Sequence, residues 1–71
     1  MNLYLAERGK EYLVERIDID DEAMRRFLFS LGCFSGQPIT VICRRWSGCT
    51  VSIQDGRYNI DNQLAKAIVV S

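Results

Sequence analysis

The sequence predicts a small, mainly β domain of about five short strands, with one short α-helix between the first and second strands. Only residues 20–36 carry a complete set of helix signals, and the residues after them form short alternating runs separated by turns. A chain of 71 residues makes one small domain, residues 1–71. A single short helix in such a chain must pack on the sheet or plug the end of a barrel.

The helix signals begin at Asp20, whose carboxylate is placed to accept hydrogen bonds from the free N–H groups of the first turn. Asp21 and Glu22 follow where the helix dipole is positive. Apolar residues then recur at i, i+3, i+4 and i+7 and predict one buried stripe, formed by Met24, Phe27, Leu28 and Leu31. Gly32 stands just beyond this stripe, where a left-handed cap requires a residue without Cβ.

The predicted strands are residues 11–17, 39–44, 49–54, 57–60 and 67–70. Alternation places Cys43 and Cys49 on apolar strand faces. Asp55-Gly56 predicts a two-residue hairpin turn, and Asp61 is placed to cap one helical turn through Ala65. Five strands in this length favour a small β-barrel of the SH3 or OB type.

Composition limits the classes of function. Nine basic and nine acidic residues give a net charge of +0, which removes the bulk attraction expected of a nucleic-acid or anionic-membrane binder and leaves room for a local basic patch. The three cysteines are an odd number, and no signal peptide or membrane-crossing stretch is evident. We therefore expect a reducing, cytoplasmic setting without direct membrane insertion.

Catalytic and metal chemistry are poorly provided for. The chain has no histidine, so the usual near-neutral general base is missing. The acidic run Asp18–Glu22 is interpreted as a helix cap, and a site for a hard cation is the alternative. The cysteines lack the spacing of zinc sites; Cys33, in a turn, is expected to be the exposed thiol, and soft-metal binding is the alternative. We predict no catalytic residue, no cofactor and no metal.

Arginine and aromatic side chains outside the predicted core are the candidates for binding a partner. Arg25 and Arg26 are expected on the solvated side of the helix, and Phe29 lies off its apolar stripe. Phe34 and Trp46 lie in turns, where large aromatic side chains either cover a small core or contact a partner. The predicted partner-binding residues are Arg25, Arg26, Phe29, Phe34 and Trp46. Arginines beside Trp46 also suit a nucleic-acid site, against which the neutral charge argues.

Several of these segments, taken in order, resemble a known family. Met24-Arg25-Arg26, Leu31-Gly32, Gly36 and Ile39-Thr40-Val41 resemble the helix, turn and following strand of the FeoA family, the small ferrous iron transport protein A. The C-terminal part is similar to the closing hairpin and terminal motif of that family, in Val51, Ile53, Gly56, Tyr58, Ile60, Ala65, Ile68, Val69 and Val70. The chain departs from the family at Asp61, where Arg is common, and at Cys33, where an aliphatic residue is common.

The resemblance implies an SH3-like β-barrel that is not an enzyme. It implies an accessory or regulatory protein of bacterial ferrous iron uptake, which binds the cytosolic part of the FeoB transporter and lies at the inner membrane through that partner. The alternatives are a detached SH3-like regulatory domain of a DtxR-type metal-dependent repressor and a small nucleic-acid-binding barrel. Open strand edges would also allow a homodimer.

Overall fold

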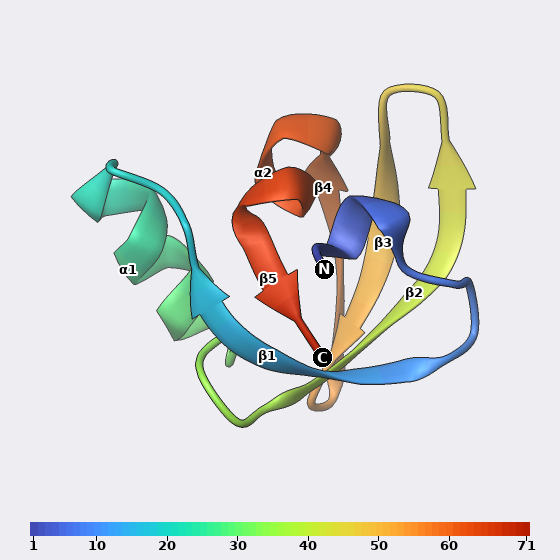
Figure 1. Cartoon of the computed structure of the whole chain (residues 1–71), viewed down its shortest axis with the longest axis horizontal. Coiled ribbons are helices and arrows are strands. Elements are labelled where there is room, and N and C mark those ends of the chain that lie inside the picture. Colours follow the sequence, from blue (N-terminus) through green and yellow to red (C-terminus); the bar gives the residue numbers. More distant parts are fainter.

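The computed structural model describes all 71 residues and contains one sheet of five antiparallel strands in the order β4-β3-β2-β1-β5 (Figure 1). The strands are β1 (Glu11–Ile17), β2 (Pro38–Arg45), β3 (Gly48–Ile53), β4 (Gly56–Asp61) and β5 (Ile68–Val70). The helical segments are the 3-10 turn η1 (Leu3–Leu5) and the α-helices α1 (Glu22–Ser30) and α2 (Asn62–Ala67). The mainly β, SH3-like fold with a helix between its first two strands is confirmed.

β1 connects the two parts of the sheet. Its first half pairs with β2, with Tyr12 opposite Ile39, and its second half pairs with β5, with Ile17 opposite Ile68. The register of the β1–β5 pairing shifts between Val14 and Arg16. This irregularity breaks the expected alternation of side chains. As a result Tyr12, Val14 and Ile17 are buried, and Arg16 is exposed.

The core is one cluster of buried apolar side chains between the curved sheet and the short helical segments. The buried residues of the strands provide most of it, and α2 adds Ala65. Leu3 of η1 is fully buried in the cluster, although the sequence predicted no element there. Arg44 holds the lead-in segment, residues 1–10, against β2, because its Nη2 donates to the carbonyl oxygens of Leu3 at 2.9 Å and Ala6 at 2.7 Å.

α1 begins one residue later than the sequence predicted. The cap is Asp21 and not Asp20, since Asp21 Oδ1 accepts from the backbone N–H of Met24 at 3.1 Å. The predicted apolar stripe is also partly wrong: Leu28 is buried, whereas Phe27 is 51% exposed. The face of α1 that packs on the core is therefore narrower than the predicted four-residue stripe.

The chain reverses sharply at the end of α1. Gly32 has φ +95°, and its N–H donates to the Phe29 carbonyl at 3.0 Å while that of Cys33 donates to the Leu28 carbonyl at 2.9 Å. These two bonds form a Schellman motif, which confirms the predicted role of Gly32. The reversal turns Cys33 inward, where it is only 1% exposed. The prediction that Cys33 is the exposed thiol is wrong.

The β2–β3 pairing contains a second irregularity, between Val41 and Cys43. Ile39 and Val41 are buried as predicted, but the shift leaves Cys43 only half-buried, close to Arg45, instead of on the apolar face. Cys49 of β3 is buried in the core, as predicted.

The hairpin between β3 and β4 is present, with its turn one residue earlier than predicted. Ile53 pairs with Gly56, so the turn residues are Gln54 and Asp55 and not Asp55 and Gly56. Gln54 has φ +52°. Positive φ at the first turn residue alone is the pattern of a type II′ turn. After β4, Asp61 Oδ1 accepts from Leu64 N at 2.8 Å and caps α2, as predicted.

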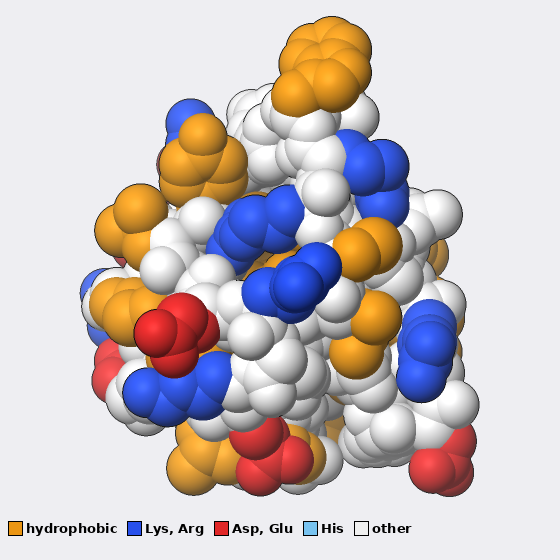
Figure 2. Space-filling model, turned by 90° about the vertical axis from the view of Figure 1, so that its right-hand side faces the viewer, with side chains coloured by type: hydrophobic (Ala, Val, Ile, Leu, Met, Phe, Trp, Pro, Cys, Tyr) orange, Lys and Arg blue, Asp and Glu red, His pale blue; other side chains and the backbone are white.

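Charged side chains are unevenly distributed over the surface. On the face that includes β2 and the lead-in segment, Lys and Arg side chains occupy the upper and middle parts, and acidic side chains lie mainly toward the lower part (Figure 2). The acidic run Asp18–Glu22 leads into α1, and arginines lie beside it: Arg16 is 3.9 Å from Asp18 and Arg26 is 3.8 Å from Glu22. Charge is thus uneven on the face shown in Figure 2 and mixed around α1.

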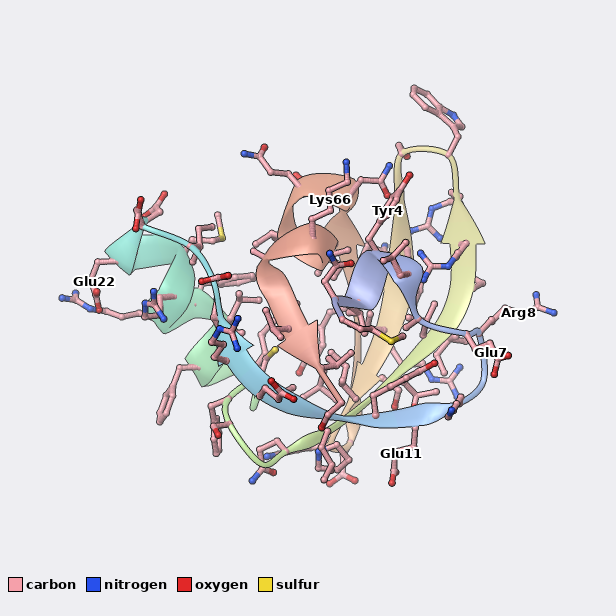
Figure 3. All side chains as sticks on the ribbon, in the orientation of Figure 1. Tyr4, Glu7, Arg8, Glu11, Glu22 and Lys66 are labelled. Atoms are coloured by element: carbon pink, nitrogen blue, oxygen red, sulfur yellow. The ribbon has the colours of Figure 1, made fainter.

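η1 and α2 meet beside the core. The Lys66 ammonium lies 4.7 Å from the centroid of the Tyr4 ring, and Figure 3 shows both side chains directed to the end of the molecule where the β2–β3 turn also lies. A cation over an aromatic face is attracted by its quadrupole. This contact ties the two short elements together at the surface.

Candidate functional site

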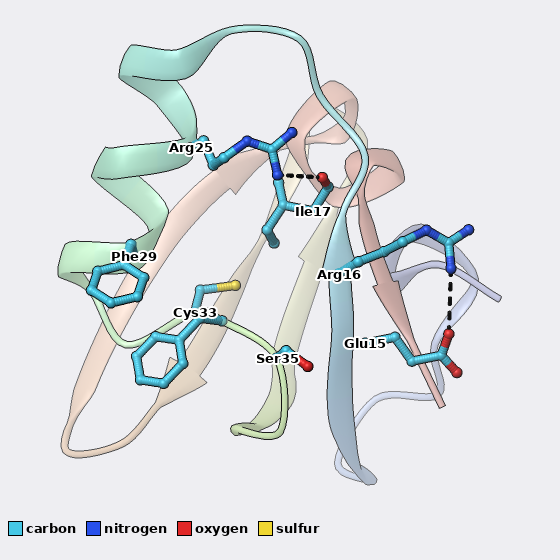
Figure 4. Close-up of a pocket in the computed structure, with 8 residues that line it drawn as sticks. Glu15, Arg16, Ile17, Arg25, Phe29, Cys33 and Ser35 are labelled. Atoms are coloured by element: carbon cyan, nitrogen blue, oxygen red, sulfur yellow. Dashed lines mark hydrogen bonds and ion pairs between the residues drawn. The ribbon is translucent and has the colours of Figure 1, made fainter.

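An apolar hollow of about 240 Å³ lies between β1, α1 and the segment that follows α1 (Figure 4). It forms because β1 extends beyond the segment that pairs with it. The last backbone hydrogen bonds between β1 and the segment before β2 join Val14 to Gly36 at 2.8 Å and to Gln37 at 2.9 Å. Beyond Val14, β1 keeps β5 on one side and faces α1 on the other. The lining residues are Glu15, Arg16, Ile17, Arg25, Phe29, Cys33, Phe34 and Ser35.

Two phenylalanines form the apolar rim of this hollow. The rings of Phe29, on α1, and Phe34, in the following segment, stack with their centroids 4.7 Å apart and an angle of 30° between their planes. Phe29 is nevertheless 62% exposed. Stacked rings hold each other in place, so the apolar surface is presented in a fixed orientation.

Arg25 forms part of the opposite wall. Its Nη1 donates to the carbonyl oxygen of Ile17 at 2.9 Å, and its Nη2 donates to that of Ile19. Arg25 is exposed, as expected, and it also makes two specific contacts that the sequence did not predict. Arg25 fastens α1 to the chain that leaves β1, and this contact holds the hollow open at a defined width.

The floor of the hollow includes the Cys33 side chain, which points between α1 and β1 in Figure 4. Burial raises the pKa of the Cys33 thiol to about 11. The thiol is therefore protonated at neutral pH and is a poor nucleophile or metal ligand there. Along the chain, no three His, Cys, Asp or Glu side chains are grouped so that they could hold a metal ion. The hollow suits an apolar side chain better than a reacting group or an ion.

The predicted partner-binding residues fall into two separate places. The hollow brings Arg25, Phe29 and Phe34 together. Arg26 lies on the outer side of α1, as expected, where its Nε is 3.8 Å from Glu22 Oε2 and its side chain is 80% exposed. Trp46 lies apart from all of these, in the β2–β3 turn at the other side of the sheet from α1 (Figure 1).

Sequence reasoning missed the β1 wall and a second apolar surface. Glu15, Arg16 and Ile17 line the hollow only because of the register shift in β1, which no local signal marks. The exposed Phe27 borders another shallow hollow with Met24 and Leu64. A signal for Phe27 was available, because three phenylalanines within eight residues exceed what a single narrow stripe buries.

The fold and the site define a class of protein: a small SH3-like module with an apolar surface suited to binding another molecule. The FeoA domain family matches residues 1–71, so the chain belongs to the FeoA family. Proteins of this family are accessory factors linked to ferrous iron transport. No match was found among curated protein sequences.

Solved structures agree with this assignment. The chain is 25% identical to an iron uptake regulatory protein, FeoA, with a TM-score of 0.86 and coverage of 99% of this chain and 93% of that one. FeoA of Stenotrophomonas maltophilia, solved with zinc and described as a prokaryotic SH3-domain protein, is 21% identical, with a TM-score of 0.88 and coverage of 100% and 89%.

A similar domain occurs in metal-dependent repressors. A manganese-dependent transcriptional repressor is 26% identical over 99% of this chain and 39% of the repressor, with a TM-score of 0.88. The fold therefore serves both as a separate protein and as a part of longer regulators.

None of the helices is both long enough and apolar enough to cross a bilayer.

Proposed function

We propose that this chain is a non-enzymatic accessory protein of bacterial ferrous iron uptake that binds the cytosolic part of a FeoB-like transporter. Membership of the FeoA family supports the process, and the stacked Phe29–Phe34 pair beside the hollow supports a protein partner. The protein acts in the cytoplasm and is held at the inner membrane by this partner.

The hollow suggests how the partner is bound. An apolar side chain of the transporter enters beside Phe29 and covers the Phe34 ring, which removes exposed aromatic surface from water. Arg16 and Glu15 lie at the rim, 3.6 Å apart as an exposed ion pair, and contact polar groups around the inserted side chain. Exposed aromatic residues of this kind typically dominate the energy of an interface.

The experiment measures retention of the full chain on the immobilised cytosolic regions of the transporter at low salt. We expect Phe29→Ala and Phe34→Ala each to weaken binding by at least about fivefold. Phe27→Ala is the matched control, since Phe27 is an exposed phenylalanine of the same helix that does not line this hollow. Failure of the unaltered chain to bind, or an equal loss in Phe27→Ala, would contradict the proposal.

The likeness to the manganese-dependent repressor supports a second candidate, a detached regulatory domain that binds a segment of another protein. Here the same hollow would receive a segment of a transcriptional regulator. Co-purification from the native cell separates the two candidates: the first predicts the transporter among the retained proteins, and the second predicts a DNA-binding regulator.

A further inference from the structure

The β2–β3 turn carries the most exposed large apolar side chain of the protein. Trp46 is 94% exposed at the tip of this hairpin. Its position is nevertheless defined, because Asn62 Nδ2 of α2 donates to the Trp46 carbonyl oxygen at 2.8 Å. The indole of Trp46 does not pack in the core and does not line the hollow beside α1. The ring is presented to the surroundings on a fixed backbone.

Three elements meet at this end of the molecule. The Asn62 bond brings α2 against the β2–β3 turn, and the bonds from Arg44 to Leu3 and Ala6 bring η1 against the end of β2. Figure 3 shows Tyr4 and Lys66 directed to the same end. We call this surface the Trp46 end; its residues are Tyr4, Arg44, Arg45, Trp46 and Lys66.

The charge of the Trp46 end is positive. Arg44 and Arg45 directly precede Trp46, and Lys66 lies on the adjoining helix. Asp61, which caps α2, also lies near this end and offsets one of these three positive charges. Asp20 and Asp21 of the acidic run line a hollow together with Asp61, Gln63 and Leu64 of the β4–α2 segment, so their repulsion of an anionic surface is reduced by the screening of exposed charges.

We propose that the Trp46 end adsorbs to an anionic lipid surface. Tryptophan is favoured at the level of lipid headgroups, where its ring and N–H match the boundary between hydrocarbon and water. Nearby Lys and Arg side chains are attracted to anionic headgroups. The protein then lies on the bilayer with one indole in the headgroup layer and no segment across it.

Two features favour a lipid surface over the other occupants. None of the five residues that define the Trp46 end lines a hollow of the protein, so the indole has no concavity beside it to receive a side chain of a protein partner. The guanidinium of Arg45 is already bonded to Thr50 at 3.1 Å and Asn59 at 3.3 Å, which leaves it poorly placed for the bidentate phosphate contacts typical of nucleic-acid sites. Diffuse attraction to a charged bilayer requires neither a concavity nor bidentate phosphate contacts.

The first test uses the intrinsic fluorescence of the full chain, because Trp46 is its single tryptophan. Vesicles of phosphatidylcholine alone are compared with equimolar phosphatidylcholine and phosphatidylglycerol at low salt. We expect a blue shift of the emission and quenching by brominated lipids with the anionic vesicles only, both reversed by added salt. Unchanged emission with saturating anionic vesicles would overturn the proposal. So would equal binding to both vesicle types.

The second test measures binding of variants by vesicle flotation. We expect Arg45→Gln and Lys66→Gln each to reduce binding to anionic vesicles roughly fivefold, and Trp46→Ala to reduce it at least as much. Arg26→Gln, which removes the charge of an exposed arginine on α1, serves as the control and should bind like the unaltered chain. Undiminished binding by all three variants would overturn the proposal, as would quenching of Trp46 by a single-stranded oligonucleotide together with no response to vesicles.

This inference does not depend on docking to the transporter. Docking is measured without lipid and responds to Phe29→Ala, whereas adsorption is measured without the transporter and responds to Trp46→Ala. Either result can fail alone. If Trp46→Ala abolishes docking and the vesicles give no signal, the Trp46 end is a protein surface and the lipid proposal is wrong.

Discussion

The Arg25 guanidinium donates from Nη1 to the carbonyl oxygen of Ile17 at 2.9 Å and so connects α1 to the end of β1. At this point β1 no longer pairs with the segment before β2. The Ile17 carbonyl group has no partner in the sheet on that side, and Arg25 provides one. A second bond from Nη2 to Ile19 fixes the chain that enters the helix. One side chain thus sets the position of α1 and the width of the hollow beside it.

Arg25→Gln should loosen this connection. Hydrogen bonds that involve a charged donor contribute more than neutral ones, so we expect a loss of about 1–2 kcal/mol in the free energy of unfolding. Urea denaturation measures this loss, and hydrogen exchange should show faster opening of α1. Arg26→Gln is the matched control, because its exposed pair with Glu22 should contribute at most about 0.5 kcal/mol. Equal losses for the two variants would contradict the role given to Arg25.

The start of α1 permits a test with adjacent aspartates. Asp21→Ala removes the acceptor of the Met24 N–H and should lower the free energy of unfolding by about 1 kcal/mol. Asp20→Ala, next to it, removes a charge that makes no such bond and should have an effect of only a few tenths of a kcal/mol. A larger effect from Asp20→Ala in urea denaturation would show that the helix begins one residue earlier.

Gly32→Ala tests the reversal after α1. The backbone is at φ +95°, and an added Cβ would lie 2.8 Å from the Gln54 side chain, so we expect a loss of about 1–2 kcal/mol. Gly9→Ala serves as the control, since Gly9 has φ +84° and no atom within 4 Å of the added Cβ. Thermal unfolding should show a larger loss for Gly32→Ala than for Gly9→Ala. Equal losses would indicate that Gln54 moves aside without cost.

The three cysteines should differ in their rates of reaction with a thiol reagent at pH 8. Thr50 and the Arg45 guanidinium lower the pKa of the half-buried Cys43 thiol, whereas burial raises the pKa values of Cys33 and Cys49. Because the thiolate is the reacting form, Cys43 should be modified first. Mass spectrometry after proteolysis identifies the site, and Cys43→Ala should remove the fast phase. Rapid labelling of Cys33 would contradict its burial.

Stability should fall in alkaline solution because of Cys33. Its pKa is raised from 9.0 to about 11, so the folded state holds the thiol proton after the unfolded state has released it. The contribution is complete below pH 9 and is lost between about pH 9 and 11, by up to about 1.4 kcal/mol per pH unit. Urea denaturation across this range should show a shallower decline for Cys33→Ala. The comparison uses the slope of unfolding free energy against pH, because the cavity left by Cys33→Ala lowers the stability at every pH.

Local signals in the sequence predicted much of the fold. The Leu31-Gly32 pair ended α1 where predicted, and Asp61 capped α2, since both depend on backbone groups within a few residues. The strands were found within one or two residues, because alternation reports directly which face is buried. The ordered set of these signals also pointed to the FeoA family, which the match over residues 1–71 confirmed.

The candidate site was predicted less completely, because its residues meet through long-range contacts. Phe29 was identified as a candidate from its position off the stripe and Phe34 from its place in a turn, but their stacking depends on the reversal at Gly32. Glu15 to Ile17 became a wall only through the shift in β1, and Phe27 was assigned to the wrong side of α1. Such shifts are decided by how strands pair, which no short pattern records.

The sequence alone determined the order of the strands and the two α-helices along the chain, the end of α1, the cap of α2 and the family, because periodicity and backbone requirements act over neighbouring residues. The tertiary structure decided the burial of Cys33, the attachment of Arg25 and the separation of Trp46 from the Phe29–Phe34 surface. These depend on two register shifts and one chain reversal, whose outcome is set by the packing of residues that lie far apart in the chain.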